Sequence, residues 1–351
     1  MKRALLATVG AITMTTSIIS CSSSDKFADK HYPEKFANTE LEYKSGFGDI
    51  LKIAKAYFTT ERVNPTPTIE LPVHAISTKQ LINEQQDVLY RLGHSSIAMK
   101  IDQQLILTDP VFSDRASPVQ WAGPKRFHQP PISLQELPSI DAVLISHDHY
   151  DHLDKASIKT LTEKVAVFIV PLKIGQILRE WNVPKEKIIE LNWWESHVHN
   201  GVEYVLTPTQ HFSGRGLTDR DGTLWGSWVI NGQQNKVFFS GDSGYFSGFK
   251  EIGDKYGPFD FTMIETGAYN TLWADIHMFP EQSVQAHIDL KGKVMMPIHN
   301  GTFDLAMHAW NEPMQQAMEI SQKRGVTMVS PEFGQRVELN EPRELKPWWN
   351  L

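Results

Sequence analysis

The stretch SHDHYDH, residues 146–152, follows directly after the apolar run IDAVLI, residues 140–145, and holds three histidines and two aspartates in seven positions. An extended strand would point its odd-numbered residues one way and His152 the other way. We therefore interpret the stretch as a loop or a helix start, in which every candidate ligand turns inward. Imidazole nitrogens and carboxylate oxygens suit a borderline metal such as zinc. The four candidate ligands are His147, His149, Asp151 and His152.

Three further donors follow later apolar runs in the same way. His211 comes shortly after EYVLTPT, Asp242 ends KVFFSGD, and His299 ends KVMMPIH. Four ligands alone would close a structural tetrahedral site, whereas additional donors would build an open site for two metals. Because strand ends present loops at the edge of a sheet, we expect these three residues to join the first four.

The order of these motifs resembles the metallo-β-lactamase superfamily, and more narrowly the N-acylphosphatidylethanolamine-hydrolysing phospholipase D family. The resemblance extends from about Leu92 to Phe303. The segments that carry it are, in order, LGHSSIAM, LILTDPVFSDRASPVQWAGPKRF, ELPSIDAVLISHDHYDHLD, LTPTQHFSGRG, LWGSWVI, FFSGDSGY, GPFDFTMIETGAYN and PIHNGTF.

The resemblance implies an α/β fold, a four-layer αββα sandwich with a two-metal site at one edge. It implies two zinc ions, although the residues leave another divalent metal open. The implied ligands are His147, His149 and His211 for one ion, Asp151, His152 and His299 for the other, and Asp242 as the bridge between them.

The reaction that the resemblance implies is hydrolysis of N-acylphosphatidylethanolamine-like phospholipids by a metal-bridged hydroxide, which releases phosphatidic acid and an N-acylethanolamine. Its expected catalytic residues are Asp151, Asp242 and His277. His277, in DIHMFPEQ, is similar to a family histidine near the metals and the substrate phosphate. Phosphate contact, proton donation and a merely structural role all remain open for it. His94 is interpreted as structural, and His197 and His199 as part of a turn.

Two other functions remain open at this point. A lactonase or another hydrolase of a soluble substrate would use the same metal ligands, because the metal site alone does not choose between a phosphoester and a lactone carbonyl. A non-catalytic zinc-binding lipoprotein is the alternative outside enzymes. The full set of ligands argues against it, because a storage or structural site needs no opening for a water.

The first residues resemble a bacterial lipoprotein signal. Lys2 and Arg3 precede an apolar and small-residue stretch, and Cys21, the only cysteine, follows IIS. We expect a signal peptide at 1–20, a tether at 21–45 that begins with a lipidated Cys21, and a hydrolase domain with an N-terminal extension at 46–351. An ordinary cleaved signal or an uncleaved anchor is the alternative. The expected location is the bacterial cell envelope, lipid-anchored and facing the periplasm, and Ser22 favours the outer membrane.

Composition limits the partners. The chain has 351 residues, 41% of them hydrophobic, so it can bury a large core. Its formal net charge of −7, without long runs of one sign, gives no electrostatic footprint for nucleic acid. No nucleic-acid partner is therefore expected. The family resemblance implies a membrane phospholipid as substrate, and the sequence leaves homo-oligomerisation open.

Apolar and alternating runs predict nine strands, separated by turn residues. They are SSIAMKID, QQLILTD, DAVLIS, VAVFIVP, EYVLTPT, GSWVING, KVFFSGD, DFTMIE and KVMMPIH. Helical periodicity predicts helices in GDILKIAKAYF, LKIGQILREW, PEQSVQAHIDL and EPMQQAMEISQKRG, the last of which should stop at Gly325.

Overall fold

The computed structural model describes residues 32–43, 47–341 and 345–350. The described residues from Lys35 onward belong to one compact unit. The predicted signal peptide and Cys21 lie outside the described residues. In the part of the chain that is described, no helix is both long enough and apolar enough to cross a membrane.

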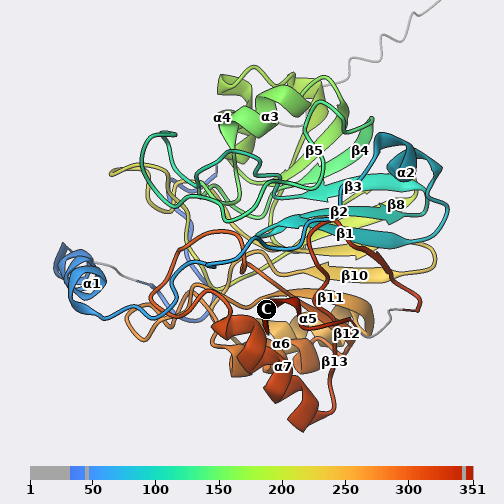
Figure 1. Ribbon diagram of the computed structural model, residues 1–351. Coiled ribbons are helices and arrows are strands. Elements are labelled where there is room, and N and C mark those ends of the chain that lie inside the picture. The colour runs from blue at the N-terminus through green and yellow to red at the C-terminus, as the bar shows by residue number, and fades with distance from the viewer. Residues whose placement is uncertain (1–31, 44–46, 342–344, 351) are drawn as a thin grey trace, which may run out of the picture. The chain divides into compact units, whose positions relative to one another are not determined.

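Two seven-stranded mixed sheets form the centre of this unit (Figure 1). The first has the order β14-β1-β2-β3-β4-β5-β6. Its strands are β1 (Val88–Gly93), β2 (Ser96–Ile101), β3 (Gln104–Thr108), β4 (Ile140–Leu144), β5 (Val165–Pro171), β6 (Ile188–Leu191) and β14 (Arg336–Glu338).

The second sheet has the order β13-β12-β11-β10-β9-β8-β7. Its strands are β7 (Ser196–His199), β8 (Val202–Thr207), β9 (Ser227–Asn231), β10 (Lys236–Phe239), β11 (Phe259–Glu265), β12 (Gly292–Ile298) and β13 (Thr327–Met328). The two sheets meet directly, for example where the indole Nε1 of Trp228 on β9 donates to the Ile145 carbonyl oxygen at 3.0 Å after β4.

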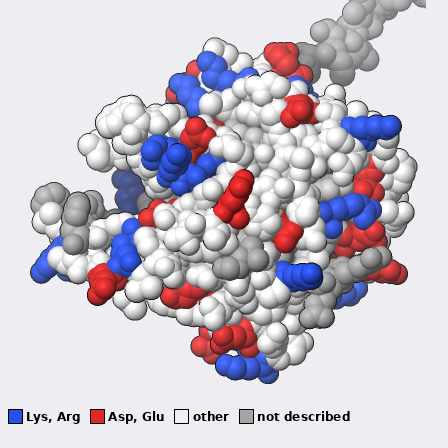
Figure 2. All heavy atoms as spheres, in the orientation of Figure 1, with Lys and Arg blue, Asp and Glu red and all other residues white. Residues whose placement is uncertain are grey.

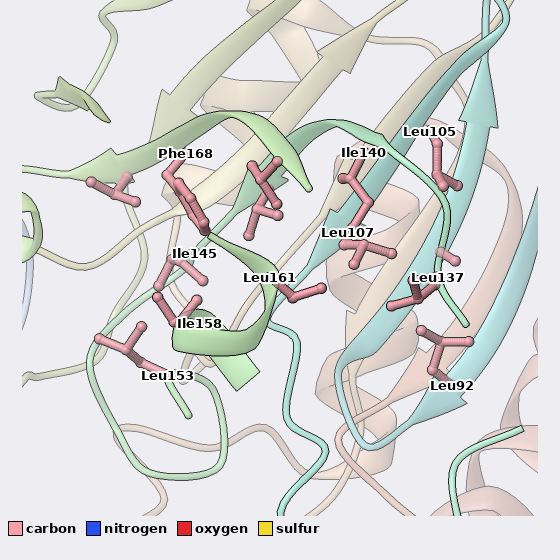
Figure 3. Close-up of a cluster of buried hydrophobic side chains, with 14 of the residues drawn as sticks. Leu92, Leu105, Leu107, Leu137, Ile140, Ile145, Leu153, Ile158, Leu161 and Phe168 are labelled. Atoms are coloured by element: carbon pink, nitrogen blue, oxygen red, sulfur yellow. The ribbon is translucent and has the colours of Figure 1, made fainter. Parts of the chain in front are cut away.

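Helices cover the outer faces of both sheets, which confirms the expected αββα sandwich (Figure 1). These helices are α2 (Thr78–Asn83), α3 (Lys155–Leu161), α4 (Ile174–Glu180), α5 (Gly248–Tyr256), α6 (Pro280–Asp289) and α7 (Glu312–Arg324). A further helix, α1 (Phe47–Thr59), packs on loop residues and not on a sheet. Ile158 and Leu161 of α3 pack on apolar side chains of the first sheet such as Phe168 (Figure 3). A second core lies between the second sheet and α5 and α6, where Phe249 and Val284 are fully buried.

All nine predicted strands and all four predicted helices are confirmed. The last helix ends where the sequence predicts, because Gly325 adopts the left-handed conformation at φ 68° that glycine reaches without steric cost. The sequence analysis missed the helices α2, α3 and α5 and five strands, including β1. The prediction of a turn at His197 and His199 is wrong, because both lie in β7, which pairs antiparallel with β8.

Strand directions bring the predicted ligands to one edge of the sandwich. β10, β11 and β12 are parallel neighbours, so their carboxyl ends meet at the same edge, and Asp242 and His299 follow two of them. β8 is antiparallel to β9, which is antiparallel to β10, so His211 after β8 reaches this edge too. The loop that carries His147 follows β4 of the facing sheet.

Residues 36–43, which belong to the tether predicted from the sequence, contact the folded unit beside this edge. The Asn38 side chain donates to the His211 carbonyl oxygen at 2.8 Å and accepts from the His211 backbone N–H at 3.1 Å. Glu40 accepts a hydrogen bond from the Ser247 backbone N–H at 2.8 Å. Basic and acidic side chains are interspersed on the face that Figure 2 shows.

Candidate metal centre

The loop after β4 has the inward-turning conformation that the sequence predicts. The backbone N–H groups of His152 and Leu153 both donate to the His149 carbonyl oxygen, at 3.1 and 2.8 Å. This tight turn places His149, Asp151 and His152 on one side of the loop. The strand alternative would have separated them.

The first cluster consists of three imidazoles. Nδ1 of His149 lies 2.9 Å from Nε2 of His147 and 3.2 Å from Nε2 of His211. The opposite nitrogen of His211, Nδ1, lies 3.0 Å from the Ile276 carbonyl oxygen and therefore carries the proton that it donates. Nε2 of His211 then carries no proton, and its lone pair is directed at the other two rings. Together the three nitrogens form a group that could hold a metal ion.

The second cluster combines a carboxylate with imidazoles. Oδ2 of Asp151 lies 3.3 Å from Nε2 of His299 and 3.6 Å from Nε2 of His152. His94 belongs to this cluster as well, because its Nε2 lies 3.1 Å from the same oxygen of Asp151. The sequence analysis interpreted His94 as structural and did not predict this contact with a candidate metal ligand.

Asp242 lies between the two clusters. Its Oδ2 is 3.0 Å from Nε2 of His299 and 3.8 Å from Nε2 of both His147 and His211. Its Oδ1 is 3.2 Å from Nε2 of His152. One carboxylate therefore faces imidazoles of both clusters, which is the geometry that a bridging ligand requires.

Two buried atoms show that these residues fit metal ions. Nε2 of His152 and Oδ1 of Asp242 are both buried, and apart from the 3.2 Å contact between them neither atom has a hydrogen-bond partner. Buried polar atoms normally have partners, because an unpaired one costs about 1–3 kcal/mol. A cation between the clusters would satisfy both atoms and the lone pair of His211 at once. The donor set of imidazoles and carboxylates is the one that zinc and similar metals take.

The electrostatics of the site differ between the two clusters. Burial holds the pKa of His147 and of His211 well below the usual range, so both rings are neutral, as metal ligands must be. Burial also lowers the pKa of His152, but the carboxylates of Asp242 and Asp151 outweigh it and raise that pKa well above the usual range. This excess of carboxylate favours a positive charge at the second cluster, which a proton or a metal ion supplies.

The backbone at His299 is strained, and the Arg91 side chain holds the next residue, Asn300, in place. His299 has a φ of 63°, in the left-handed region that residues with a Cβ avoid. Its neighbour Asn300 accepts hydrogen bonds from the fully buried Arg91, at 2.5 Å on the carbonyl oxygen and 2.7 Å on Oδ1. Because burial disfavours the charged guanidinium, it lowers the pKa of Arg91 to about 9. Arg91 was not identified from the sequence, because it lies inside β1, which has no clear strand pattern.

His277 lies beside the clusters rather than in the centre of either. Its ring centroid is 5.2 Å from that of His211 and 5.3 Å from that of His299. Its Nδ1 lies 2.7 Å from Oε1 of Glu265, which is completely buried. Glu265 was missed from the sequence, although it ends the apolar strand DFTMIE just as Asp242 follows the strand VFF.

The clusters open into a cavity of about 280 Å³ that has both polar and apolar lining residues. The polar ones are His149, Asp151, Asp242, His277 and His299, and the remaining ones are Tyr43, Ile53, Phe212, Ala268, Trp273, Ile276 and Leu305. Ile53 comes from α1, whose Tyr57 packs in the same apolar cluster. The helix predicted from GDILKIAKAYF is therefore part of the site and not only of the core.

A family model described as the β-lactamase superfamily domain matches residues 104–300. An uncharacterized protein of Mycobacterium tuberculosis is 46% identical over 263 residues, which cover 74% of this chain and 70% of that protein. A Caenorhabditis elegans protein named N-acyl-phosphatidylethanolamine-hydrolyzing phospholipase D 1 is 34% identical over 72% of this chain and 75% of its own length.

A shorter match concerns a Klebsiella pneumoniae protein named outer membrane protein RomA, which is 47% identical over 27% of this chain and 72% of that protein. The structure of a metallo hydrolase from Ignicoccus hospitalis shares the fold, with a TM-score of 0.55 and 21% identity over 72% of this chain and 98% of that one. The fold, the His/Asp clusters able to bind metal and the matching family model together identify a metallo-hydrolase of the β-lactamase fold. The chain belongs to the metallo-β-lactamase superfamily.

Proposed function

We propose that the protein is a zinc-dependent phosphodiesterase of the phospholipase D type. Its substrates would be N-acylphosphatidylethanolamine-like phospholipids of the bacterial envelope, and its products phosphatidic acid and N-acylethanolamine. The observation that carries the proposal is the mixed lining of the cavity of about 280 Å³, in which candidate metal ligands occur together with apolar side chains. A phosphodiester with an acyl chain attached combines the same two kinds of chemistry.

The size of the cavity supports a substrate that stays partly in a membrane. Pockets for drug-sized ligands measure about 300–1,000 Å³, so this cavity lies at the lower end of that range. A cavity of this size would take a phosphodiester headgroup and part of one acyl chain rather than a whole two-chain lipid. The remaining chains would stay in the lipid layer during the reaction.

Exposed apolar residues on segments next to the cavity support contact with a lipid surface. Trp121, in the loop between β3 and β4, is 83% exposed, and Leu51 on α1 is 54% exposed. These segments meet, because Tyr57 of α1 and Lys125 of the β3–β4 loop line one further cavity. A large aromatic side chain beside basic residues is typical of a protein surface that inserts into the headgroup layer.

The location that we propose is the periplasmic side of the envelope, with a lipid anchor on Cys21 and the outer membrane favoured. Its support is the lipoprotein-like start of the sequence and the relative named an outer membrane protein. Homo-oligomerisation is compatible with this location.

The residues of the site would have different roles in this reaction. Two bound divalent cations would supply positive charge that lowers the pKa of a shared water and offsets the charge on the phosphate oxygens. His147, His149 and His211 would hold one ion, and Asp151, His152 and His299 the other. Asp242 would hold both at a fixed separation. His277 is left free to contact the phosphate or the departing alcohol.

The test is a product analysis with the purified, zinc-loaded full chain in detergent. We would incubate it with N-acylphosphatidylethanolamine, with other phospholipids and with a panel of lactones, and identify products by mass spectrometry. We expect phosphatidic acid and N-acylethanolamine. His147→Ala should abolish these products, whereas His197→Ala, on the edge strand β7, should not. Opening of lactones without phospholipid cleavage would establish the lactonase alternative, and turnover of neither class by fully metal-loaded protein would favour the non-catalytic one.

A further inference from the structure

A strap formed by residues 36–43 lies against the loop between β8 and β9. Near the start of this loop, the Gln210 side chain donates to the Leu41 carbonyl oxygen at 2.6 Å. Toward its end, the Asp221 carbonyl oxygen accepts from the Phe36 N–H at 2.9 Å. The strap is therefore joined to the loop at two separate places, although it belongs to the segment that the sequence predicts as a tether.

Asn38, in the middle of the strap, binds both backbone groups of His211. Its side chain donates to the His211 carbonyl oxygen at 2.8 Å and accepts from the His211 N–H at 3.1 Å. Among the described residues, these two groups have no other hydrogen-bond partner. His211 is completely buried, and buried backbone groups need partners. A side-chain amide offers a donor and an acceptor as a peptide group does, so Asn38 takes the place that a neighbouring strand would have.

His211 is thus fixed at both of its ends. Asn38 holds its backbone, and the Ile276 carbonyl oxygen accepts from its ring Nδ1 at 3.0 Å. The Asn38 side chain is itself oriented by Trp225, whose indole Nε1 donates to Oδ1 at 3.0 Å. Zinc–imidazole bonds are only about 2.0–2.1 Å long, so a small shift of the His211 backbone would move Nε2 out of reach of a metal ion in the first cluster.

The other end of the strap forms part of the cavity wall. Tyr43 lines the cavity, and its ring centroid lies 5.6 Å from that of Phe212, the residue after His211. The Arg220 guanidinium lies over both rings, 5.2 Å from the centroid of Tyr43 and 4.6 Å from that of Phe212. The strap therefore contacts both a candidate metal ligand and the apolar lining of the cavity.

We propose that the strap is a component of the candidate metal centre, in which Asn38 is the positioning residue for His211. The proposal goes beyond the function proposed above, because it concerns binding of one metal ion and holds for any substrate. Asn38 acts through the position of His211 and not through a bond to the metal. Its effect is confined to the first cluster, because the second has a support of its own in Arg91, which donates to Asn300 beside His299.

The test measures the zinc affinity of the full chain, without substrate, in two backgrounds. His299→Ala removes a ligand from the second cluster, so the remaining ion reports on the first, and His147→Ala does the reverse. Asn38→Ala should weaken zinc binding by about 10-fold in the His299→Ala background, the lower end of what a partner behind a metal ligand contributes. In the His147→Ala background it should change the affinity by less than about twofold, since the second cluster does not contact the strap. Competition with a chromophoric chelator measures both values.

A conservative variant tests the hydrogen bonds themselves. Asn38→Asp keeps the shape and an acceptor for the His211 N–H, but it places an oxygen where the donor to the His211 carbonyl oxygen was. We expect a loss of zinc affinity in the same background and at least as large. If Asn38→Ala does not fold, this variant decides the question.

The matched control is Asn235→Ala. The Asn235 side chain is buried and donates to Asp87 at 2.7 Å, in the turn before β10 and thus at the opposite end of that strand from Asp242. This variant should lower the thermal stability of the metal-free protein, as the Asn38 variants do, but should leave the zinc affinity unchanged in both backgrounds.

Two results would overturn the proposal. Equal losses of zinc affinity in both backgrounds would indicate a general effect on folding. Unchanged affinity of the first cluster in the Asn38 variants would show that His211 is held without the strap. Because no substrate is used, the phosphodiesterase function can fail while the role of Asn38 stands, and the role of Asn38 can fail while phospholipids are still cleaved.

Discussion

Asp109 holds the far side of the His152 ring, with its Oδ2 2.7 Å from Nδ1 of that histidine. Nε2 of His152 therefore faces the carboxylates of Asp151 and Asp242. The orientation is rigid, because Asp109 also accepts hydrogen bonds from the backbone N–H of Ser146 at 2.7 Å and from its hydroxyl at 2.6 Å. A carboxylate behind a histidine fixes its tautomer and makes its other nitrogen a better metal ligand.

This relationship predicts that Asp109→Asn weakens metal binding at the second cluster. The amide keeps the shape but loses the charge that supports Nδ1–H of His152, and changes of this kind typically cost 10- to 100-fold in metal affinity. Zinc competition with a chromophoric chelator measures the loss, which should affect one ion of two. Asp141→Asn is the control, because it removes the charge of a carboxylate that accepts from the Leu105 N–H at the other end of β3. Unchanged affinity in Asp109→Asn would exclude the supporting role.

The two clusters predict separate losses of metal. His147→Ala removes a ligand from the first cluster and His299→Ala from the second, so each variant should retain about one zinc ion where the wild type holds about two. Most activity should be lost in both, because neither ion alone provides the shared water. Metal analysis by mass spectrometry under native conditions counts the ions. A wild type with one tightly held zinc, unaffected by His299→Ala, would contradict a dinuclear site.

Asp242→Asn should reduce activity more than either histidine change. Asp242 faces Nε2 of His299 at 3.0 Å and Nε2 of His147 at 3.8 Å, so it is the group that touches both clusters. A neutral amide cannot bridge two cations as a carboxylate can. We expect loss of turnover together with weakened binding of both ions. Turnover near that of the wild type would show that the bridge is another group.

Much of the site could be predicted from local sequence, because its residues follow apolar strands. Asp242, His211 and His299 are visible in this way, and parallel strand directions then bring their side chains to one edge. Glu265 gives the same signal but was missed, since one acidic residue at a strand end is usually structural. His94 was undervalued because nothing in LGHSS indicates that its ring reaches Asp151, 57 positions away.

The apolar lining of the cavity could not be predicted in this way. The pattern of GDILKIAKAYF predicts a helix with an apolar face, but not what that face covers. In the structure its Ile53 lies beside Phe212 and Trp273, which come from loops more than 150 residues later in the chain. Asn38 shows the same limit, because its bond to His211 joins positions 173 residues apart. Such contacts depend on tertiary packing, which local periodicity does not encode.

The last prediction concerns the anchor, and it rests on the sequence of residues 1–31, which lie outside the described part of the structure. If acyl chains on Cys21 hold the enzyme at a membrane, Cys21→Ser should release or mislocalise it. The loss should be nearly complete in membrane fractionation, because stable anchoring needs more than one lipid chain and this variant removes the whole attachment site. The purified variant should still hydrolyse detergent-dispersed substrate, since the candidate metal groups of the described residues are formed by side chains between His94 and His299. Ser22→Ala is the matched control and should still be acylated. Equal membrane association of wild type and Cys21→Ser, with no acyl mass on the N-terminal peptide, would mean that the segment is an ordinary signal peptide.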